Sequence, residues 1–315
     1  MGGPDMDEPL TSVIIPHLNQ LNSLEACLSS LEAQTLERSL FEIIVVDNGS
    51  SPGPEFLISR HPGVRLLYEH QPGPGPARNL GANSATGNVL CFIDADCRAH
   101  RDWLAAALCE LAASPPGTIL GGDVQICRRD PTKYTAIEVY ETVFAYRNRL
   151  HVESHGYSGT GNLVVRRSDF EKIGPFGGIL LPEDRDWGQR ARAVGFRFEY
   201  VPDMIVFHPP QTSLGRLCIQ WDREIRHDLT RARQQSANWR ITWAARALVV
   251  FCSPIVHGFW IMTARKIGFL SCCKGFAVLV AIRSYRAWRM VNLLGSSCDG
   301  VLWNRDAIVG TDEAD

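Results

Sequence analysis

Hydrophobic and polar positions change their period several times along the chain, and these changes outline alternating strands and helices. Short β-branched runs typical of buried strands cover residues 11–15, 41–47 and 64–69. Apolar residues recur at helical spacing from Leu21 to Gln34, and a loop rich in Pro and Gly at residues 71–79 leads into a second helix. This alternation predicts an α/β fold with a doubly wound, mainly parallel sheet and helices on both faces.

The alternation continues to residue 208. The further predicted elements are a strand before Asp94, a helix at 101–113, a strand at 119–126, a helix at 132–147, a glycine-rich approach to a strand at 158–165, a helix at 185–194, and two final strands at 196–201 and 204–208.

Acidic residues stand where several of these strands meet a helix or loop. Asp94 and Asp96 follow an apolar run with one residue between them, Asp47 ends an earlier strand, and Glu183 and Asp184 precede a helix. Ligands of α/β sheets bind at the carboxyl ends of the strands, and paired carboxylates suit Mg²⁺ or Mn²⁺ whose other positions go to water and phosphates. A solvated turn would explain an isolated Asp-x-Asp, but this gathering of acids predicts one shared cleft with a divalent metal.

Eight short segments, in this order and spacing, resemble the family 2 glycosyltransferases, whose domain has the GT-A fold. The matching segments are residues 13–16 with Asn19, 45–50, 75–79, 92–96, 161–166, 174–177, 182–187 and 201–208. The resemblance covers roughly residues 10 to 212 and implies an enzyme that moves a sugar from a nucleotide diphosphate sugar to an acceptor hydroxyl. A dinucleotide fingerprint is excluded, because Arg78 stands where its third glycine should be.

The resemblance also implies roles for residues of the donor site. Asp96 would ligate the metal, Asp94 would reach the ribose or the metal through water, and His208 would complete the metal shell, although a histidine that ends a strand has structural roles as well. Asp47 would bind the nucleobase and Arg78 the base or a phosphate, with turn capping and a solvated arginine as the respective alternatives. The matching residues Pro16, Asn19 and Asn162 complete the expected nucleotide-sugar site.

The acceptor hydroxyl must lose a proton, and by the same resemblance Asp184 is the general base while Glu183 orients the site. Helix capping is the alternative role of both residues, since acids favour helix N-termini. One base with direct displacement implies inversion at the anomeric carbon. Departures from the family's pattern are His17, Trp187 and Gln220-Trp-Asp-Arg223, which stands in place of the Gln-x-x-Arg-Trp motif of processive members. A non-catalytic nucleotide-sugar-binding or scaffolding protein of a glycan assembly system is the alternative function.

Charge is distributed unevenly along the chain. Residues 216–292 hold 13 Lys and Arg against 3 Asp and Glu, whereas the rest of the chain holds 19 against 31. Two apolar stretches in this basic region, residues 244–262 and 267–282, contain Arg246, Pro254, His257 and Lys274, and therefore favour helices that lie in the membrane interface over helices that span it. A helical subdomain packed on the acidic half is the alternative, and the long apolar runs argue against a nucleic-acid partner.

These observations predict four segments: a disordered N-terminus at residues 1–9, a GT-A catalytic domain at 10–212, a helical, membrane-associated region at 213–295 and a polar tail at 296–315. Ten cysteines without a CxxC pair indicate reduced thiols, and the acidic start lacks the pattern of a secretion signal. We therefore expect a cytoplasmic enzyme, peripheral at the inner face of the cell membrane, that acts on a glycan or a polyprenyl-linked acceptor.

Overall fold

The computed structural model describes residues 10–130, 132–179, 182–235, 237–264 and 267–295. The predictions for residues 1–9 and 296–315 lie outside these residues. The described chain forms two compact units. Residues 10–125 and 147–208 make up one, here called the sheet unit, and residues 126–146 and 209–295 make up the other, here called the helical unit.

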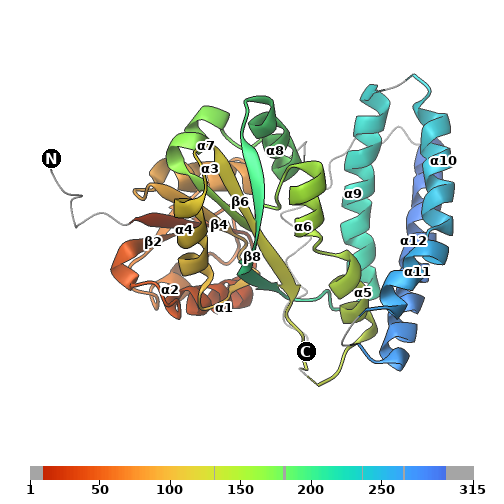
Figure 1. Ribbon diagram of the computed structural model, residues 1–315, viewed down its shortest axis with the longest axis horizontal. Helices are drawn as coiled ribbons and strands as arrows, with labels where there is room; N and C mark the ends of the chain where they lie inside the picture. The colour runs from red at the N-terminus through yellow and green to blue at the C-terminus, as the bar shows by residue number, and fades with distance from the viewer. Residues whose placement is uncertain (1–9, 131, 180–181, 236, 265–266, 296–315) are drawn as a thin grey trace. The chain divides into compact units, whose positions relative to one another are not determined.

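The sheet unit is built on one mixed sheet of eight strands in the order β3-β2-β1-β4-β7-β6-β8-β5. Figure 1 labels β2, β4, β6 and β8 of this sheet. The strands are β1 (Thr11–His17), β2 (Phe41–Asp47), β3 (Val64–Tyr68), β4 (Val89–Ile93), β5 (Arg98–Ala99), β6 (Thr118–Ile126), β7 (Asn162–Arg166) and β8 (Arg197–His208). Strands β1 to β4 run parallel to one another, and β7 pairs antiparallel with β4 and β6. The parallel half therefore brings the ends of β1, β2 and β4 to one edge.

Helices cover both faces of this sheet, as the sequence predicts. The helices of the sheet unit are α1 (Leu21–Glu32), α2 (Glu55–Ile58), α3 (Pro74–Ser84), α4 (Trp103–Ala113), α6 (Asn148–Leu150), α7 (Arg167–Ile173) and α8 (Glu183–Ala193), with short turns η1 (Arg38–Leu40) and η2 (His151–His155). Val13 and Ile15 of β1 pack with α1 and α4, whereas Ile14 between them packs with α3, α7 and α8. This period of two buries both faces of the strand.

Two predicted elements differ from the observed ones by more than two residues, and the helix predicted at 185–194 begins earlier, at Glu183, so that Glu183 and Asp184 lie in its first turn instead of before it. The final strands at 196–201 and 204–208 are one strand, β8, which continues through the exposed Pro202 because the fixed φ of proline is compatible with extended backbone. The helix expected at 132–147 is limited to α5 (Ala136–Phe144), because a capping box of Thr135 and Glu138 defines its start.

The helical unit contains α5, α9 (Leu214–Gln235), α10 (Trp239–Cys252), α11 (Pro254–Met262), α12 (Phe269–Asn292) and η3 (Leu293–Gly295). Helix α12 packs against α5, α9, α10 and α11. By length and apolar composition alone, one segment among the described residues, Trp239–Met262, could cross a bilayer, with a mean hydropathy of 1.5. The predicted interfacial position of this region stays a prediction.

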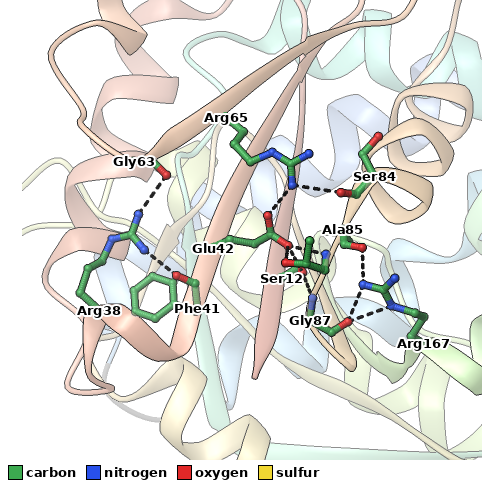
Figure 2. Close-up of polar contacts among 11 residues, drawn as sticks. Ser12, Arg38, Phe41, Glu42, Gly63, Arg65, Ser84, Ala85, Gly87 and Arg167 are labelled. Carbon is green, nitrogen blue, oxygen red and sulfur yellow. Dashed lines mark hydrogen bonds and ion pairs between the residues drawn. The ribbon is translucent and has the colours of Figure 1, made fainter. Parts of the chain in front are cut away.

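A hydrogen-bonded network fixes the loop between α3 and β4 to the amino-terminal ends of β1 and β2 (Figure 2). The Glu42 carboxylate accepts hydrogen bonds from Ser12 Oγ at 2.7 Å, from Arg65 at 2.6 Å and from the Thr86 hydroxyl at 2.6 Å. Arg167 donates to the carbonyls of residues 85 and 87 in the same loop. Burial by itself would raise the pKa of Glu42, but these bonds outweigh it and lower the pKa to about 2.

This network predicts a specific dependence of stability on pH. Because the folded-state pKa of Glu42 lies below its ordinary value of 4.5, its contribution is present above pH 4.5 and is lost as the pH falls toward 2. Allowing for solvent screening, we expect Glu42→Gln to lower the free energy of unfolding at pH 7 by about 1–2 kcal/mol and to flatten the pH profile below 4.5. Urea unfolding at several pH values measures both effects. The exposed Glu171→Gln is the control, and equal pH profiles for the two variants would contradict the assignment.

Candidate active site

A buried arginine joins two of the acids that the sequence places at the cleft. Arg78, in the first turns of α3, is 3% exposed, and it donates to Asp94 Oδ1 at 2.6 Å and to Glu183 Oε1 at 3.0 Å. Burial by itself would lower the pKa of Arg78, but the charges of Asp94 and Glu183 raise it. The guanidinium therefore holds the carboxyl end of β4 and the first residue of α8 together.

The backbone around Arg78 is fixed by glycines. Gly73 has φ +123° immediately before α3, a conformation that favours glycine. A Cβ on Gly75 would lie 2.1 Å from the carbonyl oxygen of Gly177, so a side chain there would push α3 away from the segment before α8. The loop that the sequence shows as Pro/Gly-rich thus sets the position of the Arg78 side chain.

The expected metal ligands Asp96 and His208 are neighbours. His208 Nε2 lies 3.2 Å from Asp96 Oδ2, across the end of β8 and the turn after β4. Burial by itself would raise the pKa of Asp96, but the charge and hydrogen bond of His208 lower it, so the carboxylate is ionised at neutral pH. An ionised carboxylate and an imidazole side by side are suitable donors for Mn²⁺ or Mg²⁺.

Asp94 differs from Asp96 in its contacts. One of its oxygens is bound by Arg78, while a Cβ on Gly161 would lie 2.6 Å from the other, Oδ2. Gly161 therefore leaves room beside that oxygen. Among the described residues no three His, Cys, Asp or Glu side chains gather into a ready-made metal site. The residues fit a metal that takes one or two protein ligands and completes its shell with substrate phosphates, as Mg²⁺ often does.

Asp47 stands at the end of β2 in a hydrogen-bonded turn. Its Oδ2 accepts from the backbone N–H groups of Gly49 at 3.1 Å and Ser50 at 3.0 Å, and its Oδ1 lies 3.0 Å from His17 Nδ1. The backbone N–H of Gln20 donates to His17 Nε2, which assigns the ring proton to Nδ1 and makes His17 the donor to Asp47. Burial by itself would raise the pKa of Asp47, but the bonds from His17 and Ser50 lower it.

Two asparagines, Asn19 after β1 and Asn48 after β2, fix the backbone at the corner that the carboxyl ends of these two strands form. Asn19 has φ +53°, and its side chain accepts from the backbone N–H of Ser51 at 2.8 Å. Asn48 donates to the carbonyls of Glu69 and Gln71 and accepts from the N–H of Gly73 at 2.8 Å, which ties the approach to α3 to the end of β2. Neither the role of Asn48 nor the pairing of His17 with Asp47 is visible in the sequence, because their partners lie 21 to 30 residues away in the chain.

The remaining expected site residues occupy different environments. Pro16 is half-buried in β1, and Asp184 is half-buried in the first turn of α8, where its Oδ1 accepts from the backbone N–H of Arg185 at 2.7 Å. Asn162 is fully buried: its amide donates to the carbonyls of Asp123 and Met204 and accepts from Trp103 Nε1. Its observed role is to join β6, β7 and β8, and a direct contact with the nucleotide sugar stays a prediction.

The sheet unit has an α/β fold that presents Asp47, Asp94 and Asp96 at the ends of its strands, which is where ligands of α/β sheets bind. The model of the family "Glycosyl transferase family 2" matches residues 12–174, just over half of the chain. The chain belongs to glycosyltransferase family 2.

The relatives agree with this assignment. Glycosyltransferase AglE of Haloferax volcanii is 31% identical over 207 residues, which are 64% of this chain and 67% of that protein. The pre-mycofactocin glycosyltransferase of Mycobacterium tuberculosis is 27% identical over 217 residues, 64% of this chain but only 43% of that protein. A mannosyltransferase from Pyrobaculum calidifontis, solved with GDP-Man and Mn²⁺, has the same fold, with a TM-score of 0.59 and 20% identity over 93% of this chain and 89% of that one. The chain is therefore a glycosyltransferase, as the sequence predicts, and not the scaffolding alternative.

The bridge made by Arg78 generates a stability prediction. Arg78→Met would leave two carboxylates close together without their shared cation, and we expect it to lower the free energy of unfolding by about 3 kcal/mol or more. Arg60→Met removes an arginine from an exposed pair with Glu25 and should change stability by about 1 kcal/mol or less. Urea unfolding of both variants is the measurement. If the two variants lost equal stability, Arg78 would not have the structural role described.

Proposed function

We propose that this enzyme transfers a sugar from a nucleotide diphosphate sugar to an acceptor hydroxyl, with a divalent metal and with inversion at the anomeric carbon. The observation that carries the proposal is the Arg78 bridge, which places Asp94 and Glu183 within one hydrogen-bonded group and sets Asp184 directly beside it. The separate pair of Asp96 and His208 supplies metal donors from the turn after the same strand.

The nucleoside end of the donor is assigned to the corner at the ends of β1 and β2. Asp47 is held ionised by His17 and by the turn that follows it, so its carboxylate is a fixed acceptor for the N–H groups of a nucleobase. Pro16 and Asn19 belong to the same corner and would border the nucleoside. In this proposal Arg78 positions the carboxylates and supplies positive charge on the phosphate side.

The metal is assigned to Asp96 and His208, with Asp94 beside them. When bound, a divalent cation stabilises the negative charge that develops on the diphosphate leaving group. Asp96 would hold the cation as an ionised carboxylate and His208 as a neutral imidazole. The mannosyltransferase with the same fold was solved with GDP-Man and Mn²⁺, which agrees with this choice of donor and metal.

Asp184 is the proposed general base, because Glu183 is bound to Arg78 and the positive end of the α8 dipole favours the ionised form of acids in its first turn. The Asp184 carboxylate would accept the proton of the acceptor hydroxyl while that oxygen attacks the anomeric carbon and the bond to the nucleotide diphosphate breaks. Glu183 would keep the position of this turn. A single displacement from the face opposite the leaving group inverts the configuration.

The acceptor is proposed to be a glycan or a polyprenyl-linked sugar at the cytoplasmic face of a membrane. Large apolar side chains of α10 and α11 are exposed in the helical unit, among them Val249, Phe251, Ile255 and Val256. Such side chains favour an interfacial position, and the basic residues of this region would favour anionic lipid. This placement would bring a membrane-bound acceptor to the enzyme.

The assignment of the base is tested by Asp184→Asn. We expect transfer of radiolabelled sugar from the donor to a membrane-extract acceptor to fall by about 10²–10⁴-fold, because the variant keeps the shape of the side chain but cannot accept the proton. Donor affinity should change little. Asp186→Asn, two residues further along α8, changes a half-buried ion pair with Arg190 and is the matched control. Unchanged transfer by Asp184→Asn would refute the base assignment.

The metal site is tested by thermal unfolding with UDP, GDP, dTDP and CMP in Mn²⁺, Mg²⁺ or EDTA. We expect one nucleoside diphosphate to raise the Tm in the presence of metal, because a ligand that binds only the folded state stabilises it, and we expect EDTA to remove the rise. Asp96→Asn should lose the metal-dependent rise, whereas Asp203→Asn, an exposed position of β8, should keep it. A rise that persists in Asp96→Asn would count against this ligand.

A further inference from the structure

The helical unit contains an arginine that is buried without an anionic partner. Arg286, in α12, is 8% exposed, and its guanidinium lies 3.5 Å from the centroid of the Trp221 ring in α9. Its Nε has no hydrogen-bond partner among the described residues, and no described carboxylate is paired with it. The nearby acids Asp228 and Asp222 are paired with Arg246 and Arg289 instead.

Arg286 lies along α12 between the residues of two apolar clusters of the helical unit. One cluster includes Leu279 and Ile282 of α12, and the other includes Ala287 and Met290 of the same helix. Trp221 packs against both clusters. Helix α12 carries Lys274, Arg283, Arg286 and Arg289 but no acidic residue. Helix α12 therefore contributes only positive charge to the surroundings of Arg286.

A second polar group of the helical unit has a proton without an acceptor. Tyr140 of α5 is 2% exposed, and its hydroxyl donates to no described residue; Trp221 beside it carries only an N–H donor. Burial raises the pKa of Tyr140, although the charges of Arg283 and Arg286 and a hydrogen bond with Trp221 oppose the rise. The phenol therefore stays protonated and is available as a hydrogen-bond donor.

Such an arrangement is unfavourable in the absence of a ligand. Burial, and next the charge of Arg283, lower the pKa of Arg286 to about 10, yet the guanidinium remains charged at neutral pH. Leaving a buried charge unpaired is strongly destabilising, and a cation–π contact such as the one with Trp221 recovers only part of the loss. Both the fork of an arginine and a tyrosine hydroxyl are suited to phosphate oxygens.

We infer that Arg286, together with Tyr140 and the charge of Arg283, forms a binding site for a phosphate group within the helical unit. The site is separate from the donor site of the sheet unit, and the inference does not depend on the proposed chemistry there. The phosphate could belong to a lipid headgroup or be free in solution. The exposed apolar side chains of α10 and α11 in the same unit favour the lipid, because its chains would cover them.

The full chain in EDTA is the material for the test, and thermal unfolding and vesicle co-sedimentation are the readouts. Inorganic phosphate, balanced with chloride for ionic strength, is titrated into one set of samples. A second set receives phosphatidylcholine vesicles with or without phosphatidic acid. For the unmodified protein we expect a Tm rise of a few degrees with phosphate, or at least tenfold tighter binding to the vesicles that contain phosphatidic acid.

Arg286→Met is the main variant and Arg289→Met is the matched control on the same helix. We expect Arg286→Met to keep or raise the Tm without ligand, because an unpaired buried charge is replaced by an apolar side chain, and to lose the response to phosphate or phosphatidic acid. Arg289→Met should lose the ion pair with Asp222 but keep the response. Tyr140→Phe, which removes one hydroxyl, should weaken the response and covers the case in which Arg286→Met does not fold.

The results separate the two phosphate sources and the two proposals. A response to inorganic phosphate identifies a free phosphate site, and a response only to phosphatidic acid identifies a lipid headgroup site. Asp96→Asn, which should lose nucleotide binding, should keep either response, so failure of the donor site would not be mistaken for failure here. The inference is overturned if the unmodified protein responds to neither ligand, or if the Arg286 and Tyr140 variants respond as strongly as it does.

Discussion

The bridge from Arg78 to Asp94 and Glu183 is the interaction on which the site depends. Carboxylates that gather at one sheet edge repel one another, and a buried cation between them removes much of that repulsion. Because Arg78 belongs to α3, Asp94 follows β4 and Glu183 begins α8, the same cation also fixes three elements that are far apart in the sequence. Asp184, the proposed base, follows Glu183 in α8, and Asp96, the proposed metal ligand, follows Asp94 after β4. The Arg78 bridge therefore also fixes the backbone that carries these two residues.

The two edges of the parallel strands are stabilised by opposite charge arrangements. At the amino-terminal edge, one carboxylate, Glu42, accepts hydrogen bonds from Ser12 and Arg65 (Figure 2) and from Thr86. At the carboxyl edge, one guanidinium gathers two carboxylates. In the first network both carboxylate oxygens of Glu42 accept hydrogen bonds. The second leaves Asp96, Asp184 and one oxygen of Asp94 outside the Arg78 bridge, as their proposed roles in metal binding and catalysis require. The helical unit shows a third case, in which Arg286 is buried and none of the described carboxylates forms an ion pair with it.

Much of the sheet unit could be predicted from the sequence, because its signals are local. The β-branched run at residues 41–47 is β2 with the same bounds, and the approach to α8 was recognised from Glu183 and Asp184. The predictions failed where a local signal was ambiguous. Pro202 suggested a break between two strands although extended backbone tolerates proline, and the periodic apolar face at residues 132–147 concealed the capping box that starts α5 four residues later.

The sequence by itself determined most of the strands and helices along the chain, the family, and which acids stand at strand ends, since each of these depends on residues close together in the chain. Only the tertiary structure decided how those acids differ. Asp94 and Glu183 are bound by Arg78, Asp96 lies beside His208, and Asp47 accepts from His17, because each partner comes from another element brought near by the sheet. The burial of Arg286 against Trp221 is of the same kind. The residue type, which the sequence gives, determines whether a side chain carries a charge. Its partner is determined by the fold, because the partner comes from a distant part of the chain that lies nearby only after folding.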